Sequence, residues 1–394
     1  MRLALLLALT FALAACADRP EGNLIAMEAH IAGASTVDML VATTRAPVDA
    51  PPGVMFGGER GRGLRFADIA VSIPPDGVRK IGDVQWPQQL PGDPARDFVT
   101  LRADRMELAE AKTAFDRRIV ANPSHHALVF VHGYNTRFEE AVYRFAQVAH
   151  DSGADIVPVL FTWPSRGKAL EYLYDRESAN YSRDGLEVVL QALADDPKVS
   201  EVSILAHSLG NYVAVEALRQ MAIRDRGLPA KFKNIMLASP DIDVDVFRRQ
   251  IAEIENGHAA PPITLFVAQD DKALGLSKLI AGDEPRLGAV DPTQEPYRDV
   301  LAEAHVNVVD LTSVATDDPA RHGKFASADV VHAIGVRLAS GQTLSDAKSN
   351  LGETVGAMAL NATHAVGAVA AGVATAPFDA KGAAVDQRAR RGQQ

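Results

Sequence analysis

Between residues 120 and 340, short apolar runs alternate with stretches of helical periodicity. Continuous apolar runs of this length are typical of strands that are buried on both faces. The predicted strands cover residues 126–131, 156–162, 202–206, 234–238, 263–268 and 305–311, and the predicted helices cover residues 136–151, 182–194 and 211–224. Helices between successive strands imply a mostly parallel, doubly wound sheet with helices on both faces, so the fold class is α/β.

Two further β-rich stretches, 37–43 and 66–73, precede this alternation. The Pro- and Gly-rich piece between them, 47–63, is expected to be an extended loop. We therefore expect one domain over residues 34–340, whose N-terminal β-rich part is 34–120. The Ala- and Gly-rich tail, 341–394, is expected to lie outside that domain and to be partly disordered.

The first fifteen residues have the pattern of a signal peptide, because Arg2 precedes an apolar run at 3–13. The sequence contains a single cysteine, Cys16, which excludes an intramolecular disulfide. The tetrad Leu13-Ala14-Ala15-Cys16 resembles the lipobox of bacterial lipoproteins. That resemblance implies cleavage after residue 15, lipidation of Cys16, and a tether over 16–33. A plain secretory signal is the alternative.

The resemblance also implies a location in the cell. Residue 17 is Ala and not the Asp that is associated with retention in the inner membrane, so we expect the periplasmic face of the outer membrane. A lipid anchor would hold the chain to the membrane without a spanning segment. The net charge of −10 and the pI near 5.6 argue against a nucleic-acid-binding protein, which would carry a basic face.

The segment 202–211 is predicted to form a strand, a sharp turn and the start of a helix, with Ser208 on the turn. In α/β-hydrolases this turn carries the nucleophile in a G-x-S-x-G motif. Ala206 replaces the first glycine and Gly210 keeps the second, so both flanking positions stay small. Ser208 is therefore the predicted nucleophile, and the alternative is an ordinary helix cap. Its neighbour His207 is expected to be a packing or pocket residue.

The strand at 126–131 ends in His132-Gly133-Tyr134, the place where such hydrolases build an oxyanion hole. The backbone N–H groups of Tyr134 and Leu209 are predicted to bind the oxyanion. Tyr134, Trp163 and Tyr174 are candidates for an apolar substrate wall, although they could equally pack beneath loops.

The fold requires the acid and then the histidine to follow the nucleophile along the chain, each after a strand. Asp271, after the strand at 263–268, is the favoured acid. Asp270, Asp241 and Asp243 remain as alternatives. Among eleven histidines, His322 is the one that lies in a polar loop after the last predicted strand, so it is the predicted base.

Several motifs together resemble a bacterial α/β-hydrolase family that is catalogued as a domain of unknown function. The resemblance spans residues 37–335. It rests on the early motifs Thr43-Thr44-Arg45 and Val71-Ser72-Ile73-Pro74, on the late motif His322-Gly323, and on Phe130-Val131-His132-Gly133-Tyr134-Asn135, Phe161-Thr162-Trp163-Pro164-Ser165, His207-Ser208-Leu209-Gly210-Asn211, Ala238-Ser239-Pro240-Asp241-Ile242-Asp243 and Asp271-Lys272-Ala273-Leu274. It implies the α/β-hydrolase fold and a serine-hydrolase site, but no substrate.

The expected activity is hydrolysis of a carboxylic ester or thioester, with a small or lipid-like acyl ester as the substrate and the membrane as a partner through the anchor. The spacing of His and Cys residues predicts no metal site, and the mechanism needs no cofactor. Acyl transfer by the same triad, or a non-catalytic binding role on the same fold, are the alternatives. The oligomeric state stays open.

Overall fold

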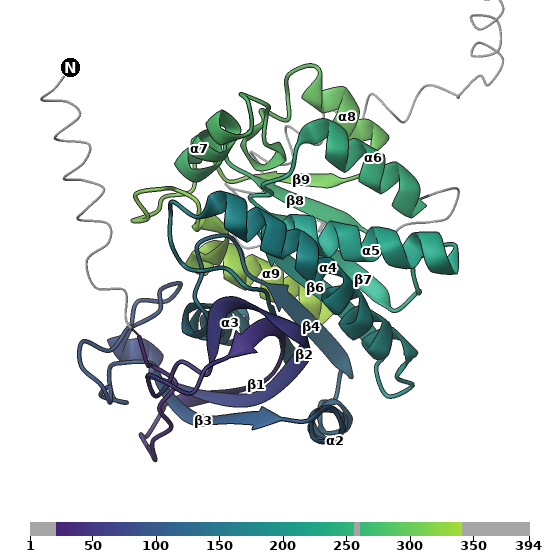
Figure 1. Ribbon diagram of the computed structural model, residues 1–394. Helices are drawn as coiled ribbons and strands as arrows, with labels where there is room; N and C mark the ends of the chain where they lie inside the picture. Colours follow the sequence, from purple (N-terminus) through teal and green to yellow (C-terminus); the bar gives the residue numbers. More distant parts are fainter. Residues whose placement is uncertain (1–20, 256–260, 341–394) are drawn as a thin grey trace, which may run out of the picture.

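The computed structural model describes residues 21–255 and 261–340 (Figure 1). The predicted signal peptide, Cys16 and the predicted tail at 341–394 lie outside these ranges. In the described part of the chain, no helix is both long enough and apolar enough to cross a membrane.

A nine-stranded sheet forms the centre of the described chain, in the order β3-β2-β1-β5-β4-β6-β7-β8-β9. The strands are β1 (Ser35–Pro47), β2 (Phe56–Ile73), β3 (Val99–Met106), β4 (His126–Val131), β5 (Val157–Thr162), β6 (Glu201–His207), β7 (Phe232–Ala238), β8 (Ile263–Val267) and β9 (Asn307–Asp310). Pairing is parallel from β1 through to β9, and β2 pairs antiparallel with β1 and β3. The predicted, mostly parallel sheet is confirmed.

Helices cover both faces of this sheet (Figure 1). They are α2 (Leu108–Ala121), α3 (Phe138–Ser152), α4 (Tyr172–Asp195), α5 (Gly210–Asp225), α6 (Val244–Glu255), α7 (Lys272–Ile280), α8 (Tyr297–Glu303) and α9 (Ala328–Ser340). One apolar layer contains side chains of α2, α4, α5, α6 and α8, and the other contains side chains of α3 and α9.

The central strand β4 shows why the sheet needs both layers. All six of its residues are buried. Ala127, Val129 and Val131 point into one apolar layer, whereas Leu128 and Phe130 point into the other. Because side chains alternate along a strand, a continuous apolar run can be buried only when both faces are covered.

The structure corrects several predicted boundaries. The loop predicted at 47–63 is shorter in the structure, because β1 runs to Pro47 and β2 already begins at Phe56. Glycines made this part of β2 resemble a loop, but pairing with β1 orders it. Helix α4 begins at Tyr172 rather than at Ser182, and α3 begins at Phe138 rather than at Thr136. β3 and α2 were not predicted.

The predicted tether at 16–33 is not free over its described part. Asn23 and Leu24 are both buried. The hydroxyl groups of Thr100 and Tyr143 donate hydrogen bonds to the Asn23 carbonyl at 2.9 and 3.0 Å, and the Leu24 amide donates to the carbonyl of Gly53 at 3.0 Å. The chain is therefore fixed to the domain from Asn23 onwards.

Candidate active site

Ser208 lies on a tight turn between the end of β6 and the start of α5. Its φ of 52° is in the left-handed region, which costs a residue with a side chain about 1–3 kcal/mol. The turn is held by hydrogen bonds: the Ser208 amide donates to the Ala238 carbonyl at 2.9 Å, and the Ser208 carbonyl accepts from the Asn211 side chain at 2.8 Å. This geometry places the serine at the carboxyl end of the sheet.

Two glycines let the neighbouring loop approach this turn. A Cβ atom on Gly133, after β4, would lie 2.7 Å from the Ser208 Cβ, and a Cβ atom on Gly210 would lie 2.3 Å from the His132 carbonyl oxygen. Neither position has room for a side chain. Ala206, where the motif usually has glycine, is accommodated within the buried part of β6.

Asp271 and His322 are brought together by the loops that follow β8 and β9. The His322 Nδ1 atom lies 2.6 Å from the Asp271 Oδ2 atom. The other carboxylate oxygen of Asp271 accepts the Leu274 amide at 3.0 Å and so caps α7. Asp318 orders the histidine loop, because its carboxylate accepts the His322 amide at 2.8 Å. The Asp271 side chain is fully buried.

The other predicted acid candidates have different partners. Asp270, next to Asp271, pairs with the Lys324 ammonium at 2.7 Å and with the Arg321 guanidinium at 2.9 Å. Its carboxylate is therefore committed to two cations. Of the two adjacent aspartates, Asp271 contacts the histidine ring.

Asp241 and Asp243 are occupied as well. Asp241 accepts hydrogen bonds from Tyr172 at 2.9 Å and from Ser277 at 2.6 Å, and it forms an ion pair with Arg286 at 3.1 Å. Burial raises the pKa of the Tyr172 hydroxyl to about 12, and the charge of Asp241 adds to the rise. Asp243 accepts backbone amides in the first turn of α6.

A small cavity of about 20 Å³ lies beside Ser208, and Tyr134, Ser208, Asp241 and His322 are among the residues that line it. A volume of this size holds about one water molecule. Because the Asp271 carboxylate accepts a hydrogen bond from the Nδ1–H group of His322, the Nε2 atom is left as the basic nitrogen of the ring. The imidazole of His322 is therefore held in one orientation in the wall of the cavity that Ser208 also lines.

His207 supports the position of His322. Its Nε2 atom lies 3.1 Å from the His322 carbonyl oxygen, which has no proton, so the ring nitrogen is the donor. The His207 ring also packs against His322 and Phe325, with ring centroids 4.6 and 4.4 Å away. Burial holds the pKa of His207 well below its usual range, and the nearby His322 lowers it further. His207 is therefore a neutral ring that braces the loop.

Two predicted pocket residues lie elsewhere. Trp163 is fully buried, its ring stacks on His132 at 4.9 Å, and its indole N–H donates to the His132 carbonyl at 2.8 Å. Tyr174 donates to the Gly58 carbonyl at 3.0 Å and packs beneath Arg166. Neither lines the cavity beside Ser208. Both pack beneath loops, so the substrate-wall interpretation was wrong for these two residues.

Sequence reasoning missed part of the cavity wall. Tyr134 does line it, together with Tyr172, whose ring packs edge-on against Tyr134 with centroids 5.2 Å apart. Residues of α7 complete the wall: Ala273, Leu274, Leu276, Ser277 and Ile280. An apolar run at 273–280 was the available signal, but the sequence does not show which element α7 faces.

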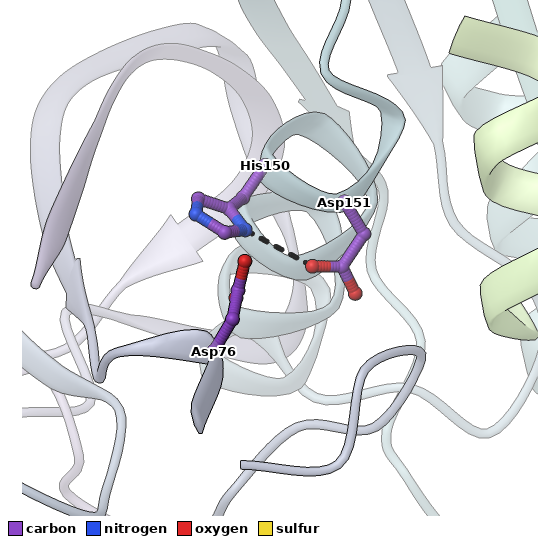
Figure 2. A group of neighbouring side chains, drawn as sticks. All are labelled: Asp76, His150 and Asp151. Carbon is purple, nitrogen blue, oxygen red and sulfur yellow. Dashed lines mark hydrogen bonds and ion pairs between the residues drawn. The ribbon is translucent and has the colours of Figure 1, made fainter. Parts of the chain in front are cut away.

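A histidine and two aspartates form a separate group at the C-terminal end of α3, shown in Figure 2: Asp76, His150 and Asp151. Such a group could in principle hold a metal ion. Here the buried guanidinium of Arg79 donates to Asp76 at 2.9 Å, lies 3.2 Å from the His150 ring nitrogen, and pairs with Asp151. The group is therefore arranged around an arginine.

The sheet order, the turn at Ser208 and the position of its partners define an α/β-hydrolase-like protein. The chain belongs to the family described as alpha/beta hydrolase of unknown function (DUF900), whose model matches residues 107–338. An uncharacterized protein, alr1448, from Nostoc sp. (strain PCC 7120) is 23% identical over 135 residues. That match covers 28% of this chain and 35% of the Nostoc protein.

Among solved structures, the chain is similar to a lipase-esterase related protein from Clostridium acetobutylicum ATCC 824. The two chains are 10% identical, and the match covers 55% of this chain and 94% of that chain with a TM-score of 0.31.

Proposed function

We propose that this protein is a serine hydrolase that cleaves a carboxylic ester or thioester. The proposal rests mainly on the 2.6 Å contact between Asp271 and His322, because His322 lies in the wall of the cavity that also contains Ser208. In this proposal Ser208 is the nucleophile, His322 is the base and Asp271 is the acid.

The proposed reaction has two steps. In the first, the His322 Nε2 atom takes the hydroxyl proton of Ser208 while the serine oxygen attacks the substrate carbonyl carbon. The backbone N–H groups of Tyr134 and Leu209 bind the resulting oxyanion, and the leaving alcohol or thiol departs with the proton from His322. In the second step, water attacks the acyl-serine ester, His322 takes its proton, and the carboxylic acid leaves while Ser208 is reprotonated.

The tight turn that carries Ser208 supports this assignment. The left-handed conformation of Ser208 directs its side chain away from the strand and helix that flank it, and the start of α5 directs its free N–H groups and positive dipole end towards the serine. Asp271, fully buried, keeps the ring of His322 in one orientation. A strained serine beside an oriented imidazole suits nucleophilic catalysis better than helix capping.

The proposal includes anchoring in the bacterial envelope through lipidated Cys16. It is supported by the arrangement of the sequence, in which the single cysteine follows an apolar run and two alanines. Metabolic labelling with an alkyne fatty acid is expected to mark the wild-type chain and not Cys16→Ser. Labelling of Cys16→Ser to the wild-type level would contradict it.

A fluorophosphonate probe tests the catalytic part, because it reacts covalently with activated serines. Wild type is expected to be labelled, and Ser208→Ala is expected to show no labelling. The matched control is Ser239→Ala, since Ser239 is also a buried serine in the left-handed region, after β7. Labelling that persists in Ser208→Ala, or a folded wild type that does not react, would contradict the proposal.

A further inference from the structure

Large apolar side chains are exposed around the mouth of the Ser208 cavity. On α7, Leu276 and Ile280 line the cavity while being 53% and 45% exposed, and Leu279 is 69% exposed. At the start of α4, Leu170 is 99% exposed and Leu173 is 67% exposed. Exposed apolar side chains that gather at one place mark an interaction surface, whereas scattered ones need no explanation.

The two helices that carry these side chains meet at the cavity. The hydroxyl groups of Tyr172 on α4 and Ser277 on α7 are 2.9 Å apart, which joins the two helices at the cavity. The Tyr134 hydroxyl donates to the carbonyl of Ala169, which holds the segment before α4 against the same wall. We call these exposed side chains the apolar rim: Leu170, Leu173, Leu276, Leu279 and Ile280.

The described chain begins on this side of the molecule. The carboxylate of Glu21 pairs with Arg137 at 3.0 Å, and Gly167 packs against the Arg137 side chain. Leu170 follows three residues after Gly167. In Figure 1 the purple start of the described chain and α7 lie on the same side, at the left of the view.

The distance to the proposed anchor is short. Five residue steps separate Cys16 from Glu21, and a fully extended chain covers about 3.3–3.6 Å per residue, so Glu21 lies within about 18 Å of a lipidated Cys16. Residues after Glu21 add no further length to this connection, because Asn23 and Leu24 are buried in the domain. With Cys16 lipidated, the side of the protein with the apolar rim would therefore be the side next to the membrane.

We propose that the apolar rim docks onto the bilayer that carries the anchor, and that the substrate is an acyl ester of a membrane lipid. Burying leucine and isoleucine side chains in the interfacial region is favourable and turns the cavity mouth towards the acyl chains. This inference rests on the proposed function, since it names the substrate class of the same serine. The lipid would reach Ser208 without crossing water.

Depth-dependent quenching tests the docking. The lipidated full chain is reconstituted in phosphatidylethanolamine–phosphatidylglycerol vesicles with NBD on Leu279→Cys or, as the control, on Ile223→Cys. Ile223 is 54% exposed near the end of α5 that lies away from Ser208. Lipidation would block Cys16, the single native thiol, so the dye reacts with the introduced one. Doxyl-labelled lipid is expected to quench position 279 at least about threefold more than position 223.

Equal quenching at both positions, or none at 279, would overturn the docking. Lack of quenching at 279 together with a dimeric chain would assign the rim to contact between two copies instead.

An activity comparison separates this inference from the proposed function. The double variant Leu170→Ser with Leu279→Ser is expected to keep wild-type fluorophosphonate labelling, because neither side chain lines the cavity. Its hydrolysis of a long-chain ester embedded in the vesicles is expected to fall by about tenfold, while Ile223→Ser stays at the wild-type rate. Unchanged hydrolysis in a double variant that is labelled would overturn the docking alone. A wild type that is not labelled would overturn the proposed function.

Discussion

Asp271 has two carboxylate oxygens with separate tasks: one caps α7 and the other contacts His322. Chain order could predict an acid after β8, but it could not separate Asp271 from Asp270, because adjacent side chains on a loop diverge according to local backbone geometry. The cap fixes the direction of Asp271. Asp270 turns instead to Lys324.

This division of tasks predicts the effect of Asp271→Asn. Asparagine is as good a helix cap as aspartate, so α7 is expected to stay folded. The amide cannot stabilise a charged His322 ring, and kcat for ester hydrolysis is expected to fall by about 10³- to 10⁴-fold. Steady-state kinetics with a nitrophenyl ester measure this.

The matched control is Asp270→Asn, whose carboxylate contacts Lys324 and Arg321 rather than the histidine. It is expected to retain most of the activity. If Asp270→Asn lost as much activity as Asp271→Asn, the acid assigned to the triad would be wrong.

At the scale of elements, α4 shows why part of the cavity could not be predicted. The first half of this helix buries polar side chains, among them Asp175, Ser178 and Ser182. Asp175 accepts the Ser165 hydroxyl at 2.6 Å, and Ser182 lies 2.8 Å from the Thr44 hydroxyl. A helix with a polar buried face lacks the apolar periodicity by which helices are recognised. Tyr172, in the cavity wall, was missed for this reason.

Helix α3 carries a buried acid, Glu139, in its first turn. Burial raises the pKa of this carboxyl to about 7, above the value of about 4.3 in an unfolded chain. The folded protein therefore holds this proton more tightly than the unfolded chain does. The resulting stability is fully present below about pH 4 and is lost as the pH rises through 7.

Glu139→Gln is expected to remove this pH dependence. Its free energy of unfolding should match wild type near pH 4 and exceed it by about 3–4 kcal/mol at pH 8. Urea denaturation at several pH values measures the difference, with the exposed Glu177→Gln as the control. A wild type that is more stable than Glu139→Gln at pH 8 would contradict the assignment.

At the scale of the whole molecule, the hairpin of β1 and β2 is part of the site's support, although it lies before the family match at residues 107–338. Arg45, at the end of β1, is buried and donates to the carbonyls of Gly57, Ser165 and Thr136 at 3.0, 2.7 and 2.8 Å. Burial lowers the pKa of its guanidinium to about 10, which leaves it charged at neutral pH. One cation thus joins β1, β2 and the loops after β4 and β5.

Arg45→Met is expected to destabilise the whole protein. Three carbonyl groups, one buried (Ser165) and two partly buried (Gly57 and Thr136), lose their donor. A buried carbonyl without a donor costs about 1–3 kcal/mol, and relief from burying a charge offsets part of this. We expect the free energy of unfolding to fall by about 2–4 kcal/mol, measured by urea denaturation. Arg65→Met, at an exposed position of the same hairpin, should lie within about 0.5 kcal/mol of wild type. Equal stability of the two variants would refute the bracing role.

The parallel sheet was predictable because β4 to β8 are short apolar runs and each is followed by a helix. The positions of Ser208 and His322 followed from that order of elements. Three other features could not be predicted, because they depend on contacts between segments far apart in sequence. They are the hairpin of β1 and β2, the part of the cavity wall formed by α7, and the polar face of α4. Arg45 and Ser165 illustrate this, since their 2.7 Å contact joins residues whose local sequences carry no sign of it.

The most direct test of the central claim is to trap the acyl-enzyme. The protein is mixed with nitrophenyl butyrate, quenched in acid within the first turnover and digested, and the acylated peptide is identified by mass spectrometry. The account predicts a butyryl group on Ser208 in wild type that is absent from His322→Ala. A butyryl group on another residue, or ester cleavage by Ser208→Ala at the wild-type rate, would contradict it.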